Sequence, residues 1–216
     1  KKGEIAKVGA GAAIGAIIGA MAGGGKGAAI GAGVGGAAGG TAGPDGGPPR
    51  VTGDALWSRR GDGLGAIHAV AAHVGGALAV AGVFRDTLDF GAGPMTSAGE
   101  NDLFVARFDE DGVCTWSRSF GGAGDDGANA VAIDPSGVVW VTGAFQGTIQ
   151  VGTEVLGSAG SYDVPLIALD AQGTPVWARR FGSAGFDVAY GLAMQELAPR
   201  CSARAPSRVA ITSASA

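Results

Sequence analysis

Few residues of this 216-residue sequence have side chains whose chemistry could support catalysis. They are two histidines and two groups of carboxylates that are adjacent in the sequence. His68 and His73 are the only histidines, and they form no reproducible arrangement with a nucleophile of the kind that a catalytic triad needs. The shift along the sequence that takes Trp116 to Trp177 places them on Asn129 and Asp134, which are ordinary positions of the repeat described below. Structural or surface roles are therefore expected for both histidines.

An acidic cluster precedes Gly112. Asp109, Glu110 and Asp111 offer oxygen atoms of the kind that bind Ca²⁺. The matching block later in the chain is Asp170-Ala-Gln-Gly, which lacks two of these carboxylates. A solvated hairpin turn is therefore the better interpretation of both blocks.

Asp125 and Asp126 form a second acidic pair, with the composition of a general acid and its base. Adjacent residues of a strand point to opposite faces, and the matching position of a later copy retains only Asp187. We predict that this aspartate fixes a loop as a hydrogen-bond acceptor.

Motifs for metals and phosphates are weak. Cys114 and Cys201 are the only cysteines and lack the CxxC spacing of zinc sites, and Cys114 is expected to be a small apolar residue at a strand edge. Lys26 follows three glycines, but Gly27 stands where a P-loop needs Ser or Thr. No catalytic residue, metal site or cofactor is predicted, and the chain is predicted not to be an enzyme.

Charge and composition narrow the class further. The chain has 15 Lys and Arg against 19 Asp and Glu, without a strong run of either sign. A basic stripe that would track phosphates is missing, so nucleic-acid binding is not expected. Glycine supplies 43 residues, where average usage would give roughly 15. Such an excess needs a structural explanation.

Some of the excess is a glycine ladder between residues 8 and 43. The glycines with i, i+4 spacing are Gly11, Gly15, Gly19, Gly23, Gly27, Gly31, Gly35, Gly39 and Gly43. In a helix this spacing forms a stripe along which two backbones pack closely, as in membranes. Ile14, Ile17, Ile18 and Met21 would form an apolar face. We predict a helical hairpin over residues 1–43, turning near Lys26.

The run from Gly15 to Gly31 resembles the two-helix glycine-zipper segments of bacterial envelope proteins. The resemblance implies association with a membrane or with further copies of the chain. The alternative is a flexible Gly/Ala-rich linker. Residues 44–53, rich in proline and glycine, are predicted to be a linker and a domain boundary.

An internal repeat covers residues 54–195. Trp57, Trp116 and Trp177 recur at nearly equal spacing, each followed by Ser-Arg or Ala-Arg. The shift that takes Trp116 to Trp177, called the repeat shift below, also aligns Gly82 with Gly143, Phe84 with Phe145, Asp102 with Asp163 and Asp109 with Asp170. Residues 196–216 match nothing upstream and are predicted to be an irregular tail.

Within one copy the pattern is that of four β-strands. The strands are expected at residues 130–134, 138–145, 164–170 and 175–181, and a longer loop at 147–162. Asp-x-x-Gly blocks begin at Asp109, Asp134 and Asp170, with the glycine supplying a positive φ for a hairpin turn. Four strands per tandem copy is the layout of a propeller blade. We predict a mainly β fold in which a glycine-zipper α-helical hairpin is followed by tandem four-stranded propeller-type blades. There are about two such blades, which make an incomplete propeller.

The repeats resemble bacterial β-propeller repeats of the SBBP type. The resemblance lies in Trp116–Asp126 and Val141–Phe145, followed by Asp163 and the Asp170–Gly173 block. It implies a large secreted or surface protein without a defined activity. Because propellers close with about four to eight blades, we expect this chain to be a fragment. The alternatives are that it completes its ring with other chains, or that its β part is unstable alone.

Each Trp-x-Arg places its two side chains on one strand face. One hypothesis pairs Arg59, Arg118 and Arg179 with a repeat-matched Asp of the next blade. The alternative is that each arginine packs its stem on the tryptophan ring.

The leading hypothesis is a non-enzymatic protein of the bacterial cell envelope or surface. In it the glycine segment binds a membrane or oligomerises the chain, and the repeats present an interaction scaffold. The alternative is a fragment of a secreted propeller that binds carbohydrate or protein, with residues 1–43 only a linker.

Overall fold

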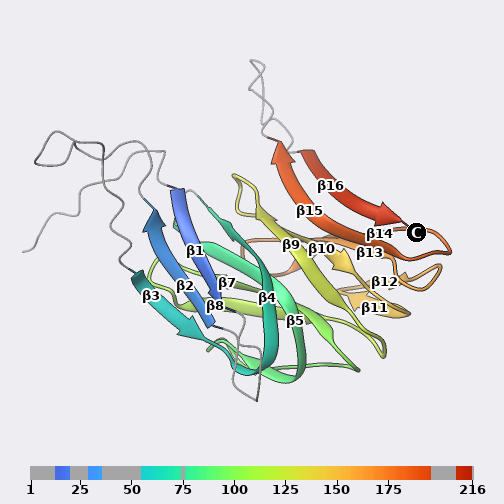
Figure 1. Cartoon of the computed structure of the whole chain (residues 1–216), viewed down its shortest axis with the longest axis horizontal. Helices are drawn as coiled ribbons and strands as arrows, with labels where there is room; N and C mark the ends of the chain where they lie inside the picture. Colours follow the sequence, from blue (N-terminus) through green and yellow to red (C-terminus); the bar gives the residue numbers. More distant parts are fainter. Residues whose placement is uncertain (1–12, 20–28, 36–54, 74–75, 196–207, 216) are drawn as a thin grey trace, which may run out of the picture.

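The protein is built of antiparallel β-sheets. The computed structural model describes residues 13–19, 29–35, 55–73, 76–195 and 208–215, and its sheets succeed one another across the molecule in chain order (Figure 1). No helix occurs in these ranges. Within the same ranges, no helical segment long and apolar enough to cross a bilayer is found. The predicted mainly β fold is confirmed.

The first repeat sheet has the strand order β4-β5-β7-β8. Its strands are β4 (Asp62–Ala72), β5 (Leu78–Asp89), β7 (Asp102–Phe108) and β8 (Cys114–Phe120), and the short β6 (Met95–Thr96) pairs with β5. Cys114 begins β8 and is buried, as expected for a small apolar residue at a strand end. Burial raises the pKa of its thiol to about 11.

The second repeat sheet repeats this layout with the order β9-β10-β13-β14. Its strands are β9 (Gly127–Ile133), β10 (Val139–Ala144), β13 (Val164–Leu169) and β14 (Pro175–Phe181). The repeat shift takes the first residue of β5 to the first residue of β10, and likewise the start of β8 to the start of β14. The predicted long loop contains the hairpin β11 (Thr148–Val151) and β12 (Glu154–Gly157). The four strands predicted for one copy are therefore confirmed.

A third copy of the pattern begins with β15 (Asp187–Gln195), which pairs with β16 (Arg208–Ser215). The prediction of an irregular tail is wrong for residues 208–215. The register of β15 with β16 reproduces that of β9 with β10, because Val209 occupies the place of Val139 and Thr212 that of Thr142. The sequence distance from Val139 to Val209 is longer than the repeat shift. A comparison of the sequence with itself at one fixed shift therefore does not align β16 with β10.

The described portion of the glycine ladder is also β-structure. Strands β1 (Ala13–Gly19), β2 (Ala29–Gly35) and β3 (Ala55–Arg60) form a sheet in that order. Gly15, Gly19, Gly31 and Gly35 lie in these strands, so the predicted helices are wrong there, whereas Gly11, Gly23, Gly27, Gly39 and Gly43 lie outside the described residues.

The helix prediction fails for a physical reason: an i, i+4 spacing is compatible with the period of a helix and with that of a strand. It is close to one helical turn, but it is also an even number and keeps one face of a strand. Each glycine costs about 1 kcal/mol in a helix interior, and the β-branched isoleucines favour strands. Because β2 pairs with β3, the sheet also crosses the predicted boundary at residues 44–53, which themselves lie outside the described ranges.

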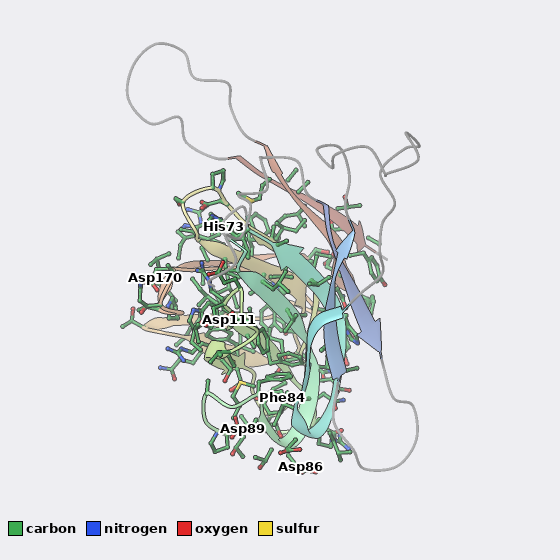
Figure 2. All side chains as sticks on the ribbon, turned by 90° about the vertical axis from the view of Figure 1, so that its left-hand side faces the viewer. His73, Phe84, Asp86, Asp89, Asp111 and Asp170 are labelled. Carbon is green, nitrogen blue, oxygen red and sulfur yellow. The ribbon has the colours of Figure 1, made fainter. Side chains whose placement is uncertain are left out.

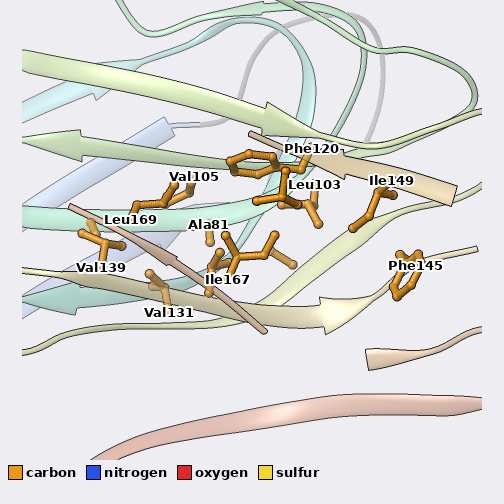
Figure 3. Close-up of a cluster of buried hydrophobic side chains, with 14 of the residues drawn as sticks. Ala81, Leu103, Val105, Phe120, Val131, Val139, Phe145, Ile149, Ile167 and Leu169 are labelled. Atoms are coloured by element: carbon orange, nitrogen blue, oxygen red, sulfur yellow. The ribbon is translucent and has the colours of Figure 1, made fainter. Parts of the chain in front are cut away.

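The main hydrophobic core lies between the two repeat sheets (Figure 3). The first sheet contributes Ala81, Leu103, Val105, Trp116 and Phe120, and the second contributes Val131, Val139, Ile167 and Leu169, among others. Phe145, which follows β10, and Ile149 of β11 also belong to this core. A second cluster covers the opposite face of the first sheet and includes Leu78, Phe84, Leu88, Phe104 and Phe108. The sheets therefore stack face to face, each buried side chain following the alternation of its strand.

Asp-x-x-Gly turns close the hairpins at one end of the sheets. The Asp109 carboxylate accepts hydrogen bonds from the amides of Asp111 and Val113, and Asp134 and Asp170 repeat these contacts. The three glycines have φ of 74°, 89° and 78°. The prediction of hairpin turns is confirmed.

The two ends of the sheets can be followed in Figure 2. His73 lies near the start of β5, and Asp86 and Asp89 lie at the other end of this strand.

Candidate functional site

The repeated Trp-x-Arg motif joins one sheet to the turns of the next. Trp116 donates its indole N–H to the carbonyl of Ala171 at 2.9 Å, and Arg118 donates to the carbonyl of Gly173 at 3.0 Å. The Arg118 guanidinium also lies 6.0 Å from the centre of the Trp116 ring. The hydrogen-bond partners of Arg118 are carbonyl oxygens, so the hypothesis of an ion pair with Asp is not supported, and packing on the ring is.

The motif looks different in its other copies. Trp177 is 38% exposed, whereas Trp116 is 5% exposed, and the Arg179 guanidinium lies 5.7 Å from the Trp177 ring. The side chains of Trp57 and Arg59 lie outside the described residues. Of the other predicted repeat residues, Phe145 is fully buried in the main core, and Asp109 and Asp170 hold their turns.

Gly143 stands where two strands approach closely. A Cβ atom at this position would lie 1.9 Å from the Gly127 carbonyl oxygen, and the same holds for Gly82 against Ala66. Both glycines adjoin a break in strand register, where β9 and β4 each carry one extra residue, Asn129 and His68. The glycine is therefore required by the bulge and does not itself take part in a binding site.

The extra residue of each bulge contacts the first strand of the next copy through its side chain. We call these first strands, β4, β9 and β15, the inner strands. His68 Nδ1 lies 3.0 Å from the Ala128 carbonyl oxygen, and the Asn129 amide donates to the Ala189 carbonyl at 3.0 Å. These contacts are equivalent in consecutive repeats. The structural role predicted for His68 is confirmed. His73 Nε2 lies 3.5 Å from the Pro135 carbonyl oxygen in the turn end of the stack.

Four buried aspartates hold the loops that precede the strands. Asp126 accepts hydrogen bonds from the amides of Gly122 and Gln146, and Asp187 accepts one from Ser183. Burial, with Asp102 and Asp125 nearby, raises the pKa of Asp126 to about 6. The prediction that this aspartate fixes a loop as an acceptor is confirmed.

Asp102 and Asp163 are the other two of these aspartates, and they accept from the amides of Ala98 and Ala159 at 2.9 Å each. Burial raises the pKa of Asp102. Asp163 also forms an ion pair with Arg180.

A cleft opens at the end of the sheets opposite the Asp-x-x-Gly turns. Its volume is about 400 Å³, and its polar and aromatic lining consists of Asn101, Asp125, Asp126, Asn129, Tyr162, Phe186 and Tyr190. Asn101 precedes β7 of the first repeat sheet, and Asp125, Asp126 and Asn129 lie just before and in β9 of the second. Tyr162 precedes β13 of the second sheet, and Phe186 and Tyr190 lie just before and in β15. The Tyr190 and Phe186 side chains are 64% and 44% exposed.

The lining residues occupy matched positions of consecutive repeats. The repeat shift takes Asn101 to Tyr162, Asp125 to Phe186 and Asn129 to Tyr190. In one copy the Asn101 amide donates to Asp125 at 2.6 Å, and in the next the Tyr162 and Phe186 rings make an edge-to-face contact at 5.0 Å. The backbone is also equivalent, since the amides of Asp126 and Asp187 donate to the carbonyls of residues 101 and 162.

The two copies that line the cleft thus share the same backbone contacts but differ in their side chains. Three amide or carboxylate groups in one copy are replaced by three aromatic rings in the next, while Asp126 and Asp187, which hold the loops, stay the same. Such a surface can stack an apolar face of a ligand on the rings and bond its polar groups at the other side. This site was not predicted from the sequence, although the repeat shift aligns its residues.

No known protein-family model matches the chain, and the search of curated proteins finds no match either.

Proposed function

We propose that the chain is a non-enzymatic interaction scaffold of propeller-type blades. The two repeat sheets are the blades, and the β15–β16 pair begins a third. Two features support the blade arrangement. The inner strands β4, β9 and β15 follow one another, and consecutive sheets are joined by matched contacts from His68 and Asn129.

The main support for a binding role is that the side chains lining the cleft differ between the two copies while the backbone contacts stay the same. The next copy does not keep Asn101, Asp125 and Asn129, although it keeps the backbone contacts beside them. Instead it carries Tyr162, Phe186 and Tyr190, two of which are largely open to solvent. Exposed aromatic rings clustered with polar groups are typical of binding surfaces.

A carbohydrate is the ligand class that this chemistry fits best. The C–H faces of a sugar ring stack on aromatic side chains, and its hydroxyl groups pair with amides and carboxylates. A non-enzymatic role is supported by the way the carboxylates are engaged. Asp126 accepts two backbone amides and Asp125 accepts the Asn101 amide, so both carboxylates have roles in holding the loops.

Calorimetric titration with a panel of neutral oligosaccharides tests the proposal. We expect saturable binding to the full chain that is weakened at least about tenfold by Phe186→Ala or Tyr190→Ala, as for the central contacts of a small site. Phe181→Ala is the matched control, since Phe181 is equally exposed at 44% but lies outside the cleft. Absence of binding throughout the panel, or equal weakening by Phe181→Ala, would contradict a carbohydrate site here.

The location at the bacterial cell envelope or surface, or outside the cell, rests on the resemblance of the repeats. The expected membrane association depended on helices in residues 1–43. Since strands occupy the described portion of that segment, we propose that it adds strands to the β-sheets, as the pairing of β2 with β3 indicates. Liposome flotation, described in the Discussion, tests this assignment.

A further inference from the structure

Asp102 is a buried carboxylate whose charge has little compensation. Its side chain lies in a residue that is only 2% exposed. One oxygen, Oδ2, accepts the Ala98 amide at 2.9 Å, whereas Oδ1 has no hydrogen-bond partner. Among the described residues, no basic side chain forms an ion pair with it. Because burial of an unpaired carboxylate is costly, this charge requires a partner.

The matching carboxylate of the next copy has a positively charged partner. The repeat shift takes Asp102 to Asp163, which is fully buried and forms an ion pair with Arg180 through Oδ2. The Oδ1 atom of Asp163 also has no hydrogen-bond partner, so the difference between the two carboxylates is the counter-charge.

The half-buried Ser119 takes the place of Arg180 in the first repeat sheet. The repeat shift joins these two residues, and each is the last but one of its strand, β8 or β14. These strands pair in matching register with β7 and β13. The same place after the first tryptophan, Trp57, is Arg60, so two of the three copies carry an arginine here. The serine leaves the first sheet without this positive charge.

The contacts of Arg180 show which atoms surround a positive charge at this place. Besides Asp163, its Nη1 donates to the Gly182 carbonyl at 3.3 Å. A carboxylate and a backbone carbonyl therefore hold the cationic group in the second repeat sheet.

The first repeat sheet presents the corresponding oxygen atoms. They are the Asp102 carboxylate and the Gly121 carbonyl, and the Ser119 hydroxyl group adds a third kind of oxygen. Gly121 lies directly against Asp102, since a Cβ atom there would overlap the carboxylate, and Gly182 is placed in the same way on Asp163. Carboxylate, carbonyl and hydroxyl oxygens are the ligands that hard cations prefer.

A second negative charge lies near this position. Asp126 is 2% exposed, and the charge of Asp102 is one of the causes that raise its pKa. The two carboxylates therefore interact, and a divalent ion beside Asp102 would compensate both. Of the divalent ions, Ca²⁺ accepts irregular sets of oxygen ligands, whereas Mg²⁺ demands a nearly ideal octahedron.

We propose that Asp102, Ser119 and the Gly121 carbonyl hold a Ca²⁺ ion at the place that the Arg180 guanidinium occupies in the next copy. Water molecules complete its coordination. Because no three His, Cys, Asp or Glu side chains cluster as metal ligands in the described ranges, the expected dissociation constant is about 10⁻⁴–10⁻³ M. The proposal does not depend on a carbohydrate ligand in the cleft.

Urea unfolding of the full chain in about 10 mM CaCl₂, against NaCl of equal ionic strength, tests the site. An ion that binds the folded state with a dissociation constant of about 1 mM lowers the unfolding equilibrium constant by about tenfold. Asp102→Asn should abolish this shift. The control Asp111→Asn removes an exposed carboxylate of a turn and should keep it. MgCl₂ at the same concentration should have a smaller effect.

Exchanging the residues of the two copies gives the sharper test. Ser119→Arg installs the arginine of the next copy, so it should raise the midpoint in the absence of Ca²⁺ and remove the response to the ion. Arg180→Ser frees Asp163 and should enlarge the response. These two variants keep the test decisive if Asp102→Asn fails to fold.

Three results would overturn the proposal. The first is a parent whose unfolding does not respond to Ca²⁺. The second is a response that persists unchanged in Ser119→Arg and in Asp102→Asn. The third is a response that Arg180→Ser leaves unchanged, because the two positions would then not be equivalent. If Ser119→Arg stabilises a parent that ignores Ca²⁺, the partner of Asp102 is a proton, since burial already raises the pKa of this carboxyl.

Discussion

At the scale of single residues, Gly143 and Gly82 are the described glycines where the backbone leaves least room. An alanine Cβ would lie 1.9 Å from the Gly127 carbonyl oxygen, so Gly143→Ala has to displace strand β9. We expect the free energy of unfolding to fall by roughly 2 kcal/mol or more in urea titrations. Gly157→Ala is the control, because a Cβ there meets nothing within 4 Å. Similar losses in the two variants would contradict the requirement for glycine in the bulge.

Asp126 predicts a specific dependence of stability on pH. Its folded-state pKa is raised from 3.8 to about 6, so between these values the folded state binds more protons than the unfolded state. The contribution of Asp126 is therefore fully present below pH 3.8 and is lost as the pH rises through about 6. From a shift of this size we expect the loss to reach at most about 3 kcal/mol. Asp102, whose pKa is also raised, acts in the same direction.

Urea unfolding at a series of pH values measures this effect. Asp126→Asn should flatten the decline of stability across this interval, because the titrating group is gone, although the variant also loses an acceptor for one backbone amide. Asp111→Asn, which changes an exposed carboxylate in a turn, should keep the decline of the parent. A parent whose stability rises over this interval would contradict the assignment.

At the scale of elements, the Trp-x-Arg strands connect neighbouring sheets through turn carbonyls. Arg118→Ala removes a charged donor to Gly173 and should lower the free energy of unfolding by about 1 kcal/mol. Arg179→Ala, at the matched position on the open face, should cost less than about 0.5 kcal/mol, as exposed pairs usually do. Denaturant titration of the two variants gives the comparison, and a larger loss for Arg179→Ala would argue against the carbonyl contacts of Arg118.

The elements that the sequence predicted well are those with local signals. The Asp-x-x-Gly turns and the strand of residues 175–181 were predicted correctly, since turn chemistry and alternation act over a few residues. Strand β16 was missed because its match to β10 lies farther along the chain than the repeat shift reaches. The cleft was missed for a different reason. Its residues, such as Asn101 and Tyr190, come together only when inner strands from different copies stack.

The glycine ladder shows why a periodic pattern alone does not determine an element. Residues such as Gly15 and Gly31 fit a helical stripe and one face of a strand equally well, because their spacing is even and close to one helical turn. What decides between the two is pairing with a distant segment. Strand β2 pairs with β3, whose break in register matches that of β7 on β8. A sequence pattern does not contain that long-range contact.

At the scale of the whole molecule, the glycine-rich strands predict how the chain responds to truncation. A version that starts at Pro44 lacks β1 and β2, and β1 approaches β4 of the first repeat sheet (Figure 1). We expect the far-ultraviolet circular dichroism difference between the full chain and this version to be that of β-structure. The truncated version should also unfold at lower denaturant, because the β1–β3 sheet no longer supports the stack. Neither version is expected to float with liposomes. A helical difference spectrum, together with flotation of the full chain alone, would overturn the strand assignment and restore a helical membrane anchor at residues 1–43.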